Sequence, residues 1–396
     1  MNFKKSALAI LPAIFLSHIS FADELSGHIG IETRLYTQDP IYTEQADQQI
    51  SLHAETEFYF EVGENGNGIT FTPYIRLNSE DAASNQFDLR EFMYLHVGDD
   101  WELKVGLGKV FWGVTETLHL VDIINQTDNL ASFDGEEKLG QAMIHYSQIN
   151  DWGVIDAFIL PGFRERSFAG NEGRLRPQLK IIEDASYESS DGQSHIDYAL
   201  RWSHSIDDWD LGLSWFNGTS READFKPVAS ATGVELQPFY GQINQLGVDV
   251  QYIYQDWLWK LEAITRQSDT MQDINAAVGG FEYSQVGILD TAIDLGWVVE
   301  YAFDNRDSNV APRQNDISFA TRWALNDAES TEFLVGFSQD LEHSGSRSAF
   351  VEGSTRVGDS LVVTVDAWFF SADTDQDLSY AVRNDDFVQV DFSYYF

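Results

Sequence analysis

The chain of 396 residues contains no cysteine, which excludes a disulfide framework and any metal site built from thiolates. Basic residues are scarce: 24 Lys and Arg stand against 64 Asp and Glu, and the formal net charge is −40 at pH 7. This acidity argues against nucleic acid as a partner and against a polybasic contact with a membrane surface. Beyond the N-terminus no run of about 18 apolar residues occurs, so the sequence predicts no transmembrane helix.

Signatures of catalysis and cofactor binding are also missing. The sequence has no Gly-x-Ser-x-Gly, no His-Glu-x-x-His, no P-loop and no dinucleotide fingerprint. No two histidines of the mature chain have metal-ligand spacing, and Ser147 near His145 is not by itself a hydrolase signature. We therefore expect no enzyme, no cofactor and no metal site.

The first 22 residues have the layout of a secretory signal peptide. Two lysines precede an apolar run over residues 7–16, and a small-x-small cleavage site ends at Ala22. The run is too short to span a membrane as a helix. We expect that residues 1–22 direct export, that the mature chain starts at Asp23, and that residues 23–396 form one domain.

The end of the chain alternates between apolar and polar residues. Three apolar positions of its last strand are Phe392, Tyr394 and the terminal Phe396. A period of two predicts a strand with one apolar and one polar face, and a soluble β-sandwich could bury such a strand. The pattern resembles the C-terminal strand of bacterial outer-membrane β-barrels, in which these aromatics are the assembly signal. The resemblance implies recognition by the barrel assembly machinery.

The same alternation recurs about eighteen times, in segments near the 9–11 residues that a tilted spanning strand needs. Short and long connections alternate; Gly98–Asp100, Ile149–Asp151 and Ser205–Asp208 are short, whereas Phe111–Gln141, Pro161–Ser194 and Gly218–Asn244 are long. Single-chain bacterial barrels have short periplasmic turns and long extracellular loops. The sequence therefore predicts an all-β, antiparallel, up-and-down transmembrane barrel of porin type with 16–18 strands, in the outer membrane of a Gram-negative cell.

Four tryptophans each follow an aspartate and open a strand just after a short turn: Trp101, Trp152, Trp209 and Trp257. On this topology they lie at one membrane interface, which predicts an aromatic girdle. The alternative is four unrelated core tryptophans. Outer-membrane lipid and lipopolysaccharide are the expected contacts of the outer wall.

Two positions disturb the alternation. Pro73 falls on the outer face of a strand, and its missing N–H fits an interior strand poorly. In the following strand the facing of Glu91 stays open, and a β-bulge is one solution.

A barrel of 16–18 strands leaves an aqueous interior, so the inward faces should be polar. The predicted basic residues of the lumen are Arg34, Arg76, Lys104, Arg201, Lys260, Arg266, Arg322 and Arg356. Acids on the same inward faces include Glu262, Glu300, Glu352 and Asp366. In a milder interpretation these charges only hydrate and brace the wall.

The segment Phe111–Gln141 follows the fifth predicted strand, where general porins fold their third outer loop inward. It mixes apolar residues with acids, and we expect it to pack inside the barrel mouth. The candidate constriction residues are Glu116, His119, Asp122, Asp128, Asp134, Glu136, Glu137 and Lys138. Within the segment, Trp112–Asp128 resembles a stretch of some alginate-export-like or uncharacterised outer-membrane families.

The start of the next long loop, Pro161–Pro177, carries four arginines. It could dock on the acidic segment Phe111–Gln141, bind lipopolysaccharide phosphates or meet an anionic solute.

These observations predict a channel for passive diffusion of small hydrophilic solutes. The alternative is a plugged barrel that acts as a surface binding or adhesion protein through its long loops, and a barrel hydrolase is a third hypothesis. The sequence does not decide between a monomer and a homo-oligomer.

Overall fold

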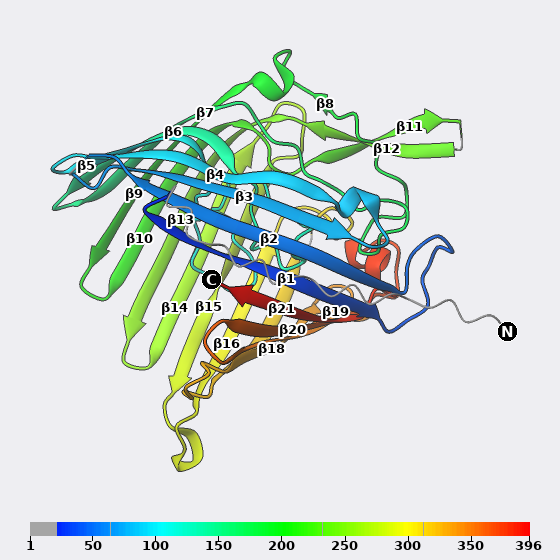
Figure 1. The fold of residues 1–396 in the computed structure, drawn as a ribbon. Coiled ribbons are helices and arrows are strands. Elements are labelled where there is room, and N and C mark those ends of the chain that lie inside the picture. The colour runs from blue at the N-terminus through cyan, green and yellow to red at the C-terminus, as the bar shows by residue number, and fades with distance from the viewer. Residues whose placement is uncertain (1–21, 64, 232, 312) are drawn as a thin grey trace.

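The computed structural model describes residues 22–63, 65–231, 233–311 and 313–396, so the predicted signal peptide, apart from Ala22, lies outside the described residues. The described residues form a closed antiparallel β-barrel of 18 strands (Figure 1), which confirms the predicted fold. The strands follow one another around the wall in chain order, and β1 closes the barrel by pairing with both β2 and β21.

The wall strands are β1 (Glu24–Tyr36), β2 (Gln48–Glu61), β3 (Gly68–Asn78), β4 (Gln86–Val97), β5 (Trp101–Gly108), β6 (Gln141–Asn150), β7 (Gly153–Pro161), β9 (Ile196–Ile206), β10 (Trp209–Thr219), β13 (Gln242–Tyr254), β14 (Trp257–Gln267), β15 (Ile274–Gln285), β16 (Asp294–Asp304), β17 (Asn315–Ala324), β18 (Glu332–Asp340), β19 (Arg347–Val357), β20 (Leu361–Ser371) and β21 (Phe387–Tyr395). The short 3₁₀ helices are η1 (Ala82–Ser84), η2 (Gly192–Ser194), η3 (Ile288–Asp290) and η4 (Leu378–Val382). None of the described helices is long and apolar enough to cross a membrane.

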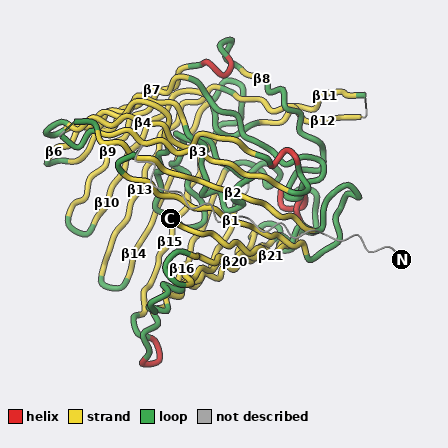
Figure 2. The backbone as a smooth tube through the Cα atoms, viewed as in Figure 1, coloured by secondary structure: helices red, strands yellow, loops and turns green. Residues whose placement is uncertain are grey.

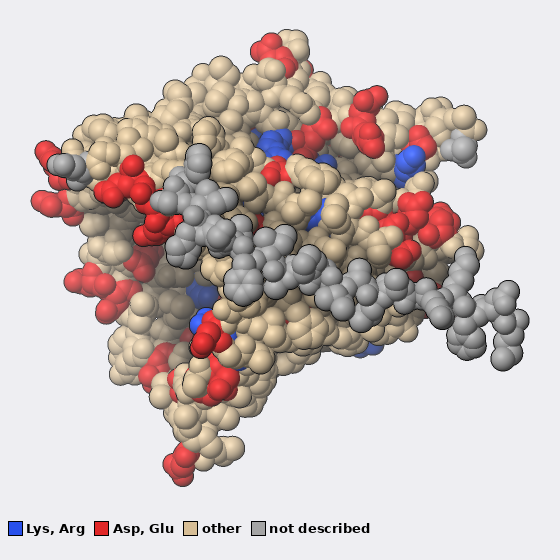
Figure 3. All heavy atoms as spheres, in the orientation of Figure 1, with Lys and Arg blue, Asp and Glu red and all other residues tan. Residues whose placement is uncertain are grey.

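Long and short connections separate to opposite ends of the barrel (Figure 2). Apolar side chains face outward along each strand, whereas inward positions are polar and buried, as Ser51, Asp197 and Glu262 show. In Figure 3 the acidic residues of the visible face gather toward the two ends, and most of the wall between them is uncharged. A barrel that spans a lipid bilayer would need this arrangement, with apolar side chains on the outside and every backbone polar group paired within the wall.

The last residue of the chain lies at the barrel seam, where β1 pairs with β21. Phe392, Tyr394 and Phe396 point outward and are exposed. The backbone N–H and C=O of Phe396 both bond to Gly27 of β1, at 3.1 and 3.2 Å. The terminal residue is therefore part of the β1–β21 closure.

A β-bulge in β4 accounts for the two positions that disturb the alternation. Thr72 pairs with Glu91 and the next residue, Pro73, pairs with Leu89, so Arg90 is the extra residue. The bulge turns both Arg90 and Glu91 toward the interior, and the ladder is already interrupted where Pro73 lacks its N–H.

Two of the segments predicted to be loops contain a small β-sheet that the sequence did not indicate. Within the segments expected to be loops, β8 (Ser186–Tyr187), β11 (Asp224–Ser230) and β12 (Gly233–Tyr240) form a separate three-stranded sheet beyond the barrel end (Figure 1). Pro227 interrupts the pattern of β11. A hairpin that is not part of the barrel wall needs no continuous apolar face, so the alternation that marks the wall strands is missing here.

The four predicted girdle tryptophans lie at the short-turn end of the barrel, at or next to the starts of β5, β7, β10 and β14. Trp209 stacks on Tyr252 with ring centroids 4.3 Å apart, and Trp101 stacks on Tyr146 at 5.9 Å. Trp152 and Trp209 are exposed, and Trp101 and Trp257 are half-buried.

Candidate functional site

The segment Phe111–Gln141, referred to below as the inner loop, lies inside the barrel. It leaves the wall after β5 and makes hydrogen bonds to β14 and β16, which stand across the barrel in the strand order. Val121, Ile123 and Ile124 are buried in the core cluster that the loop forms with the wall. The apolar residues of this acidic segment therefore explain its inward position.

The fully buried carboxylate of Glu262 on β14 holds the first part of the inner loop. Its Oε1 accepts hydrogen bonds from the N–H of Val114 (2.7 Å), the N–H of Thr115 (3.1 Å) and the Thr115 hydroxyl (2.8 Å). Its Oε2 accepts from the N–H of Val121 at 3.1 Å. These donors satisfy a buried carboxylate that has no ion-pair partner among the described residues.

Glu300 on β16 holds the next residues of the loop in the same way. Its carboxylate accepts from the N–H groups of Glu116 (2.8 Å) and Thr117 (2.9 Å), and from the Thr117 hydroxyl (2.7 Å). The side chain of Glu116 then pairs with Arg322 at 2.6 Å and Lys260 at 3.7 Å. Residues 114–121 are thus fixed to the far wall by two carboxylates.

The second part of the inner loop contacts two further regions of the wall, on β20 and β4. The ring of Phe133 packs edge-on against Trp368 and Phe370 of β20, with centroids 5.1 and 5.3 Å apart. Asp128 pairs at 2.6 Å with Arg90, the residue that the β4 bulge turns inward. The loop therefore contacts the wall on several sides of the lumen.

The predicted constriction residues fall into two groups. Asp122 and Asp128 are buried and neutralised, Asp122 by Lys138 at 3.0 Å and Asp128 by Arg90. Burial raises the pKa of Asp122, although Lys138 opposes that shift. By contrast Asp134, Glu136 and Glu137 are exposed, together with the half-exposed Glu116.

His119 pairs with Glu136 at 2.7 Å. Burial alone would lower the pKa of His119, but the hydrogen bond and charge of Glu136 outweigh it and raise that pKa. The same hydrogen bond lowers the pKa of Glu136. The pair closes the exposed turn of the inner loop.

Two cavities flank the inner loop and share part of their lining, including Glu116, Asp134, Glu136 and Arg313. The larger, of about 500 Å³, lies between the loop, the strands β17–β20 and η4. The smaller, of about 230 Å³, is lined on its basic side by Lys138, Arg166, Arg221, Arg266 and Arg306. Acids of the loop thus face arginines across the smaller cavity.

Most of the predicted basic residues of the lumen are paired on the wall. Arg201 forms a bidentate pair with Asp249, with both contacts at 2.8 Å, and Lys104 lies 3.7 Å from Glu102. Arg266 and Arg306 both contact Glu222, and although burial alone would raise the pKa of Glu222 they lower it to about 2. Three more of these residues also face inward: Lys260 and Arg322 contact Glu282, and Arg356 is exposed near the short-turn end.

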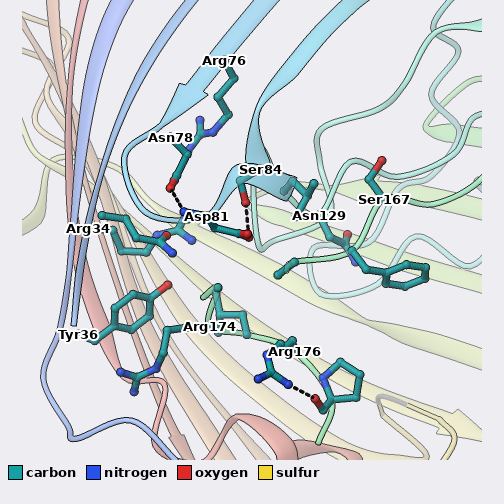
Figure 4. Close-up of a pocket in the computed structure, with 17 residues that line it drawn as sticks. Arg34, Tyr36, Arg76, Asn78, Asp81, Ser84, Asn129, Ser167, Arg174 and Arg176 are labelled. Carbon is teal, nitrogen blue, oxygen red and sulfur yellow. Dashed lines mark hydrogen bonds between the residues drawn. The ribbon is translucent and has the colours of Figure 1, made fainter. Parts of the chain in front are cut away.

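Arg34 and Arg76 line a small pocket of about 80 Å³ toward the long-loop end, together with Arg174 and Arg176 (Figure 4). Arg76 pairs with Glu32 at 2.5 Å, and Arg34 lies 4.0 Å from the same carboxylate. Arg174 pairs with Asp385 at 2.7 Å and packs over the ring of Tyr36. The arginines of this pocket brace the barrel mouth against its loops.

The basic start of the loop 161–194 docks across the mouth. Arg164 pairs with Asp88 of β4 at 2.9 Å, and Arg166 donates to Gln126 of the inner loop at 3.1 Å. Of the interpretations left open by the sequence, docking describes these contacts. The acids that pair with these arginines lie outside the inner loop: Asp88, Asp385, Asp47 and Glu44.

Ser147, His145 and Asp156 meet on the inward faces of β6 and β7. The His145 Nε2 atom lies 3.0 Å from the Ser147 hydroxyl and 2.8 Å from Asp156 Oδ1. Serine and aspartate thus share one ring nitrogen, whereas a hydrolytic triad needs the carboxylate on the other nitrogen. Among the described residues no group of three His, Asp or Glu side chains is placed to hold a metal ion.

No protein-family model matches the chain, and no curated protein sequence matches it significantly. Solved structures with a similar fold include Wzi of Escherichia coli (TM-score 0.53, 11% identity, covering 92% of this chain and 83% of that chain). Wzi is described as an outer-membrane protein involved in group 1 capsule assembly and as a carbohydrate-binding β-barrel. Variants of the Rh. blastica porin match with a TM-score of 0.46 and 11% identity, over 94% of this chain and 99% of the porin. The chain has the fold of outer-membrane β-barrels.

Sequence reasoning placed Glu262 and Glu300 on inward faces but did not identify them as the anchors of the inner loop. It also missed the inward aromatic residues Phe350 and Trp368. Near these two residues, β19 and β20 have apolar residues at consecutive positions. Alternation with a period of two therefore does not show that Phe350 and Trp368 face the interior.

Proposed function

We propose that the barrel is an outer-membrane channel through which small hydrophilic solutes diffuse passively. The observation that supports this most is the inner loop, which crosses the interior of a closed 18-strand wall and leaves cavities of about 500 and 230 Å³ beside it. Barrels of this size enclose an aqueous channel, and an inward loop limits its width.

The charges beside the loop would set the selectivity of this channel. Asp134, Glu136 and Glu137 are exposed acids on the loop. Three arginines of the smaller cavity are paired with acids: Arg266 with Glu222, Arg306 with Glu222 and Asp304, and Arg221 with Asp197. Fixed negative charge between low-dielectric walls attracts cations, and salt screens that attraction. The channel should therefore show a mild preference for cations that weakens as salt is added.

Planar-bilayer recording of the purified, folded barrel tests this proposal. The expected result is stepwise single-channel conductance with a reversal potential displaced toward cations in a salt gradient. A folded barrel that inserts into the bilayer but passes no current would refute the channel.

The second candidate is a plugged barrel that binds a ligand through its outer end. The loop 161–194 docks across the mouth through Arg164, Arg166 and Arg174, and this contact favours it. Carbohydrate is a candidate ligand by analogy with the fold neighbour Wzi. Absence of conductance combined with binding of a polysaccharide to the folded protein would favour this candidate over the channel.

We further propose that residues 1–22 direct export and that the last strand is recognised by the barrel assembly machinery. The outward apolar wall would then contact outer-membrane lipid and lipopolysaccharide. Mass spectrometry of the membrane-derived protein should find Asp23 as its first residue, and an intact Met1 would contradict the signal peptide.

A further inference from the structure

The larger cavity has an aromatic wall. Phe350 of β19 and Trp368 of β20 stack with centroids 4.9 Å apart at 19°, and Phe370 continues the stack at 6.2 Å and 15°. Phe133 of the inner loop closes the same side. Inward faces of water-filled barrels are normally polar, so four aromatic rings lining one interior cavity form a distinct apolar surface.

Carboxylates outnumber basic groups in the rest of the lining. Seven acids line the cavity against two basic residues, Arg313 and Arg347; the acids are Glu116, Asp134, Glu136, Asp316, Asp340, Glu352 and Asp377. Of these, Glu116 is paired with Arg322 and Glu136 with His119. The cavity nevertheless keeps an excess of negative charge.

Glu352 stands out in this set. It lies directly opposite Asp366 in the β19–β20 ladder, and like charges in that position disfavour the sheet. In the described part of the chain no hydrogen bond or ion pair reaches the Glu352 carboxylate, while Asp366 accepts one from Gln389 at 3.2 Å. A lumenal carboxylate that faces another and lacks a partner is suited to a cationic ligand.

The cavity also contains a polar side chain without a partner. Ser346 lines it, is only 2% exposed, and its hydroxyl makes no hydrogen bond within the described residues. Buried hydroxyls are normally satisfied, so a group that completes this one is expected in the cavity.

We propose that this cavity binds an organic cation: a protonated amine that carries an aromatic ring or a short apolar chain. The apolar part lies against Trp368 and Phe350, whose ring faces attract positive charge, and the ammonium group faces Glu352 and Asp134. Such a ligand combines the two features of the lining, which a neutral sugar or an anion does not. Binding of the cation does not require conduction. The inference rests on the proposed channel only for the statement that the bound cation is also a transported solute.

Equilibrium binding to the folded barrel in detergent tests the site without any need for conduction. The probes are phenethylammonium and 2-phenylethanol, which have the same ring and chain but differ in charge. By calorimetry or saturation-transfer NMR the cation should bind at least about fivefold more tightly than the alcohol. Equal affinities would overturn the proposal and would point to an uncharged ligand such as a sugar.

Two variants locate the binding. Glu352→Gln replaces the unpaired carboxyl group with a neutral amide, and Trp368→Leu removes the ring face. Each should raise the dissociation constant of phenethylammonium at least about fivefold. Glu57→Gln, on β2 and outside both cavities, is the matched control and should leave binding unchanged. Heat-modifiable gel mobility checks that each variant folds. Folded Glu352→Gln with wild-type affinity, or equal losses in Glu57→Gln, would refute the site.

Bilayer recordings separate this inference from the channel. If phenethylammonium lowers the single-channel current of the wild type but not that of Glu352→Gln, both the channel and the cation site are supported. Current without binding of the cation refutes the site and leaves the channel, whereas cation binding without current refutes the channel and leaves the site.

Discussion

Removing the Glu262 carboxylate should release the inner loop from the far wall. Glu262→Ala eliminates four hydrogen bonds, from the N–H groups of Val114, Thr115 and Val121 and the hydroxyl of Thr115. Hydrogen bonds to a charged group each contribute about 1.5–3 kcal/mol, and four of them amount to at least ~6 kcal/mol. Water that reaches the freed N–H groups offsets part of this, so we expect a net loss of ~2–4 kcal/mol in loop attachment.

The expected consequence is a wider and noisier channel. Single-channel recordings of Glu262→Ala should show higher mean conductance and new current fluctuations, and limited proteolysis should cut within residues 111–141. Glu300→Ala should act in the same direction, and the double variant more strongly. Glu57→Ala removes an inward carboxylate that does not contact the loop and serves as the control.

Unchanged conductance and unchanged protease resistance in folded Glu262→Ala would refute the reasoning. That result would mean that the apolar packing of Val121, Ile123 and Ile124 alone positions the loop. The two carboxylates would then be ordinary buried groups of the wall.

Three further predictions concern other parts of the molecule. Deleting Phe396 removes both of its backbone bonds to Gly27 at the seam, so the heat-modifiable folded amount in membranes should fall; unchanged yield would contradict this. Changing Asp134 and Glu136 to their amides should move the reversal potential toward anions, whereas Asp122→Asn, at a paired and buried site, should leave it in place. The pKa of His119 is raised, so its ion pair with Glu136 forms below the pKa of His119 and is lost as the pH rises through it. The pKa of Glu136 is lowered, and the same pair is lost as the pH falls through the pKa of Glu136. Current fluctuations should therefore be smallest in the pH range between the lowered pKa of Glu136 and the raised pKa of His119, and grow on either side of it. A His119→Gln variant that keeps the same pH profile would contradict this.

The wall of the barrel could be predicted from the sequence because each wall strand has an apolar outer face and a more polar inner face. Every second residue of a spanning strand meets hydrocarbon, so the period of two appears in β2 and β21 without knowledge of their neighbours. The lengths of the connections can also be read directly from the sequence, and their alternation between short and long assigns each connection to one end of the barrel. The small sheet of β8, β11 and β12 is separate from the wall, lacks this constraint, and was predicted only as loops.

The interior could be predicted only in part, because its contacts join residues far apart in the chain. The apolar content of the inner loop indicated that it is buried, but Glu262 lies more than 140 residues after Val114 and Thr115. Asp122 and Asp128 look like free acids in the sequence, yet each has a basic partner that only the folded loop and the β4 bulge bring into contact. Charge counts along a segment therefore overstate the charge that a solute would meet.

The most direct test of the account exploits the absence of cysteine. Asp134→Cys places a single thiol on the exposed part of the inner loop, beside both cavities. A cationic methanethiosulfonate reagent added during planar-bilayer recording should lower the single-channel current of this variant in irreversible steps. It should not change the current of Leu213→Cys, whose side chain is exposed on the outer surface of the barrel. A conducting Asp134→Cys channel that the reagent modifies chemically without any change in current would contradict the claim that the inner loop lines the pathway.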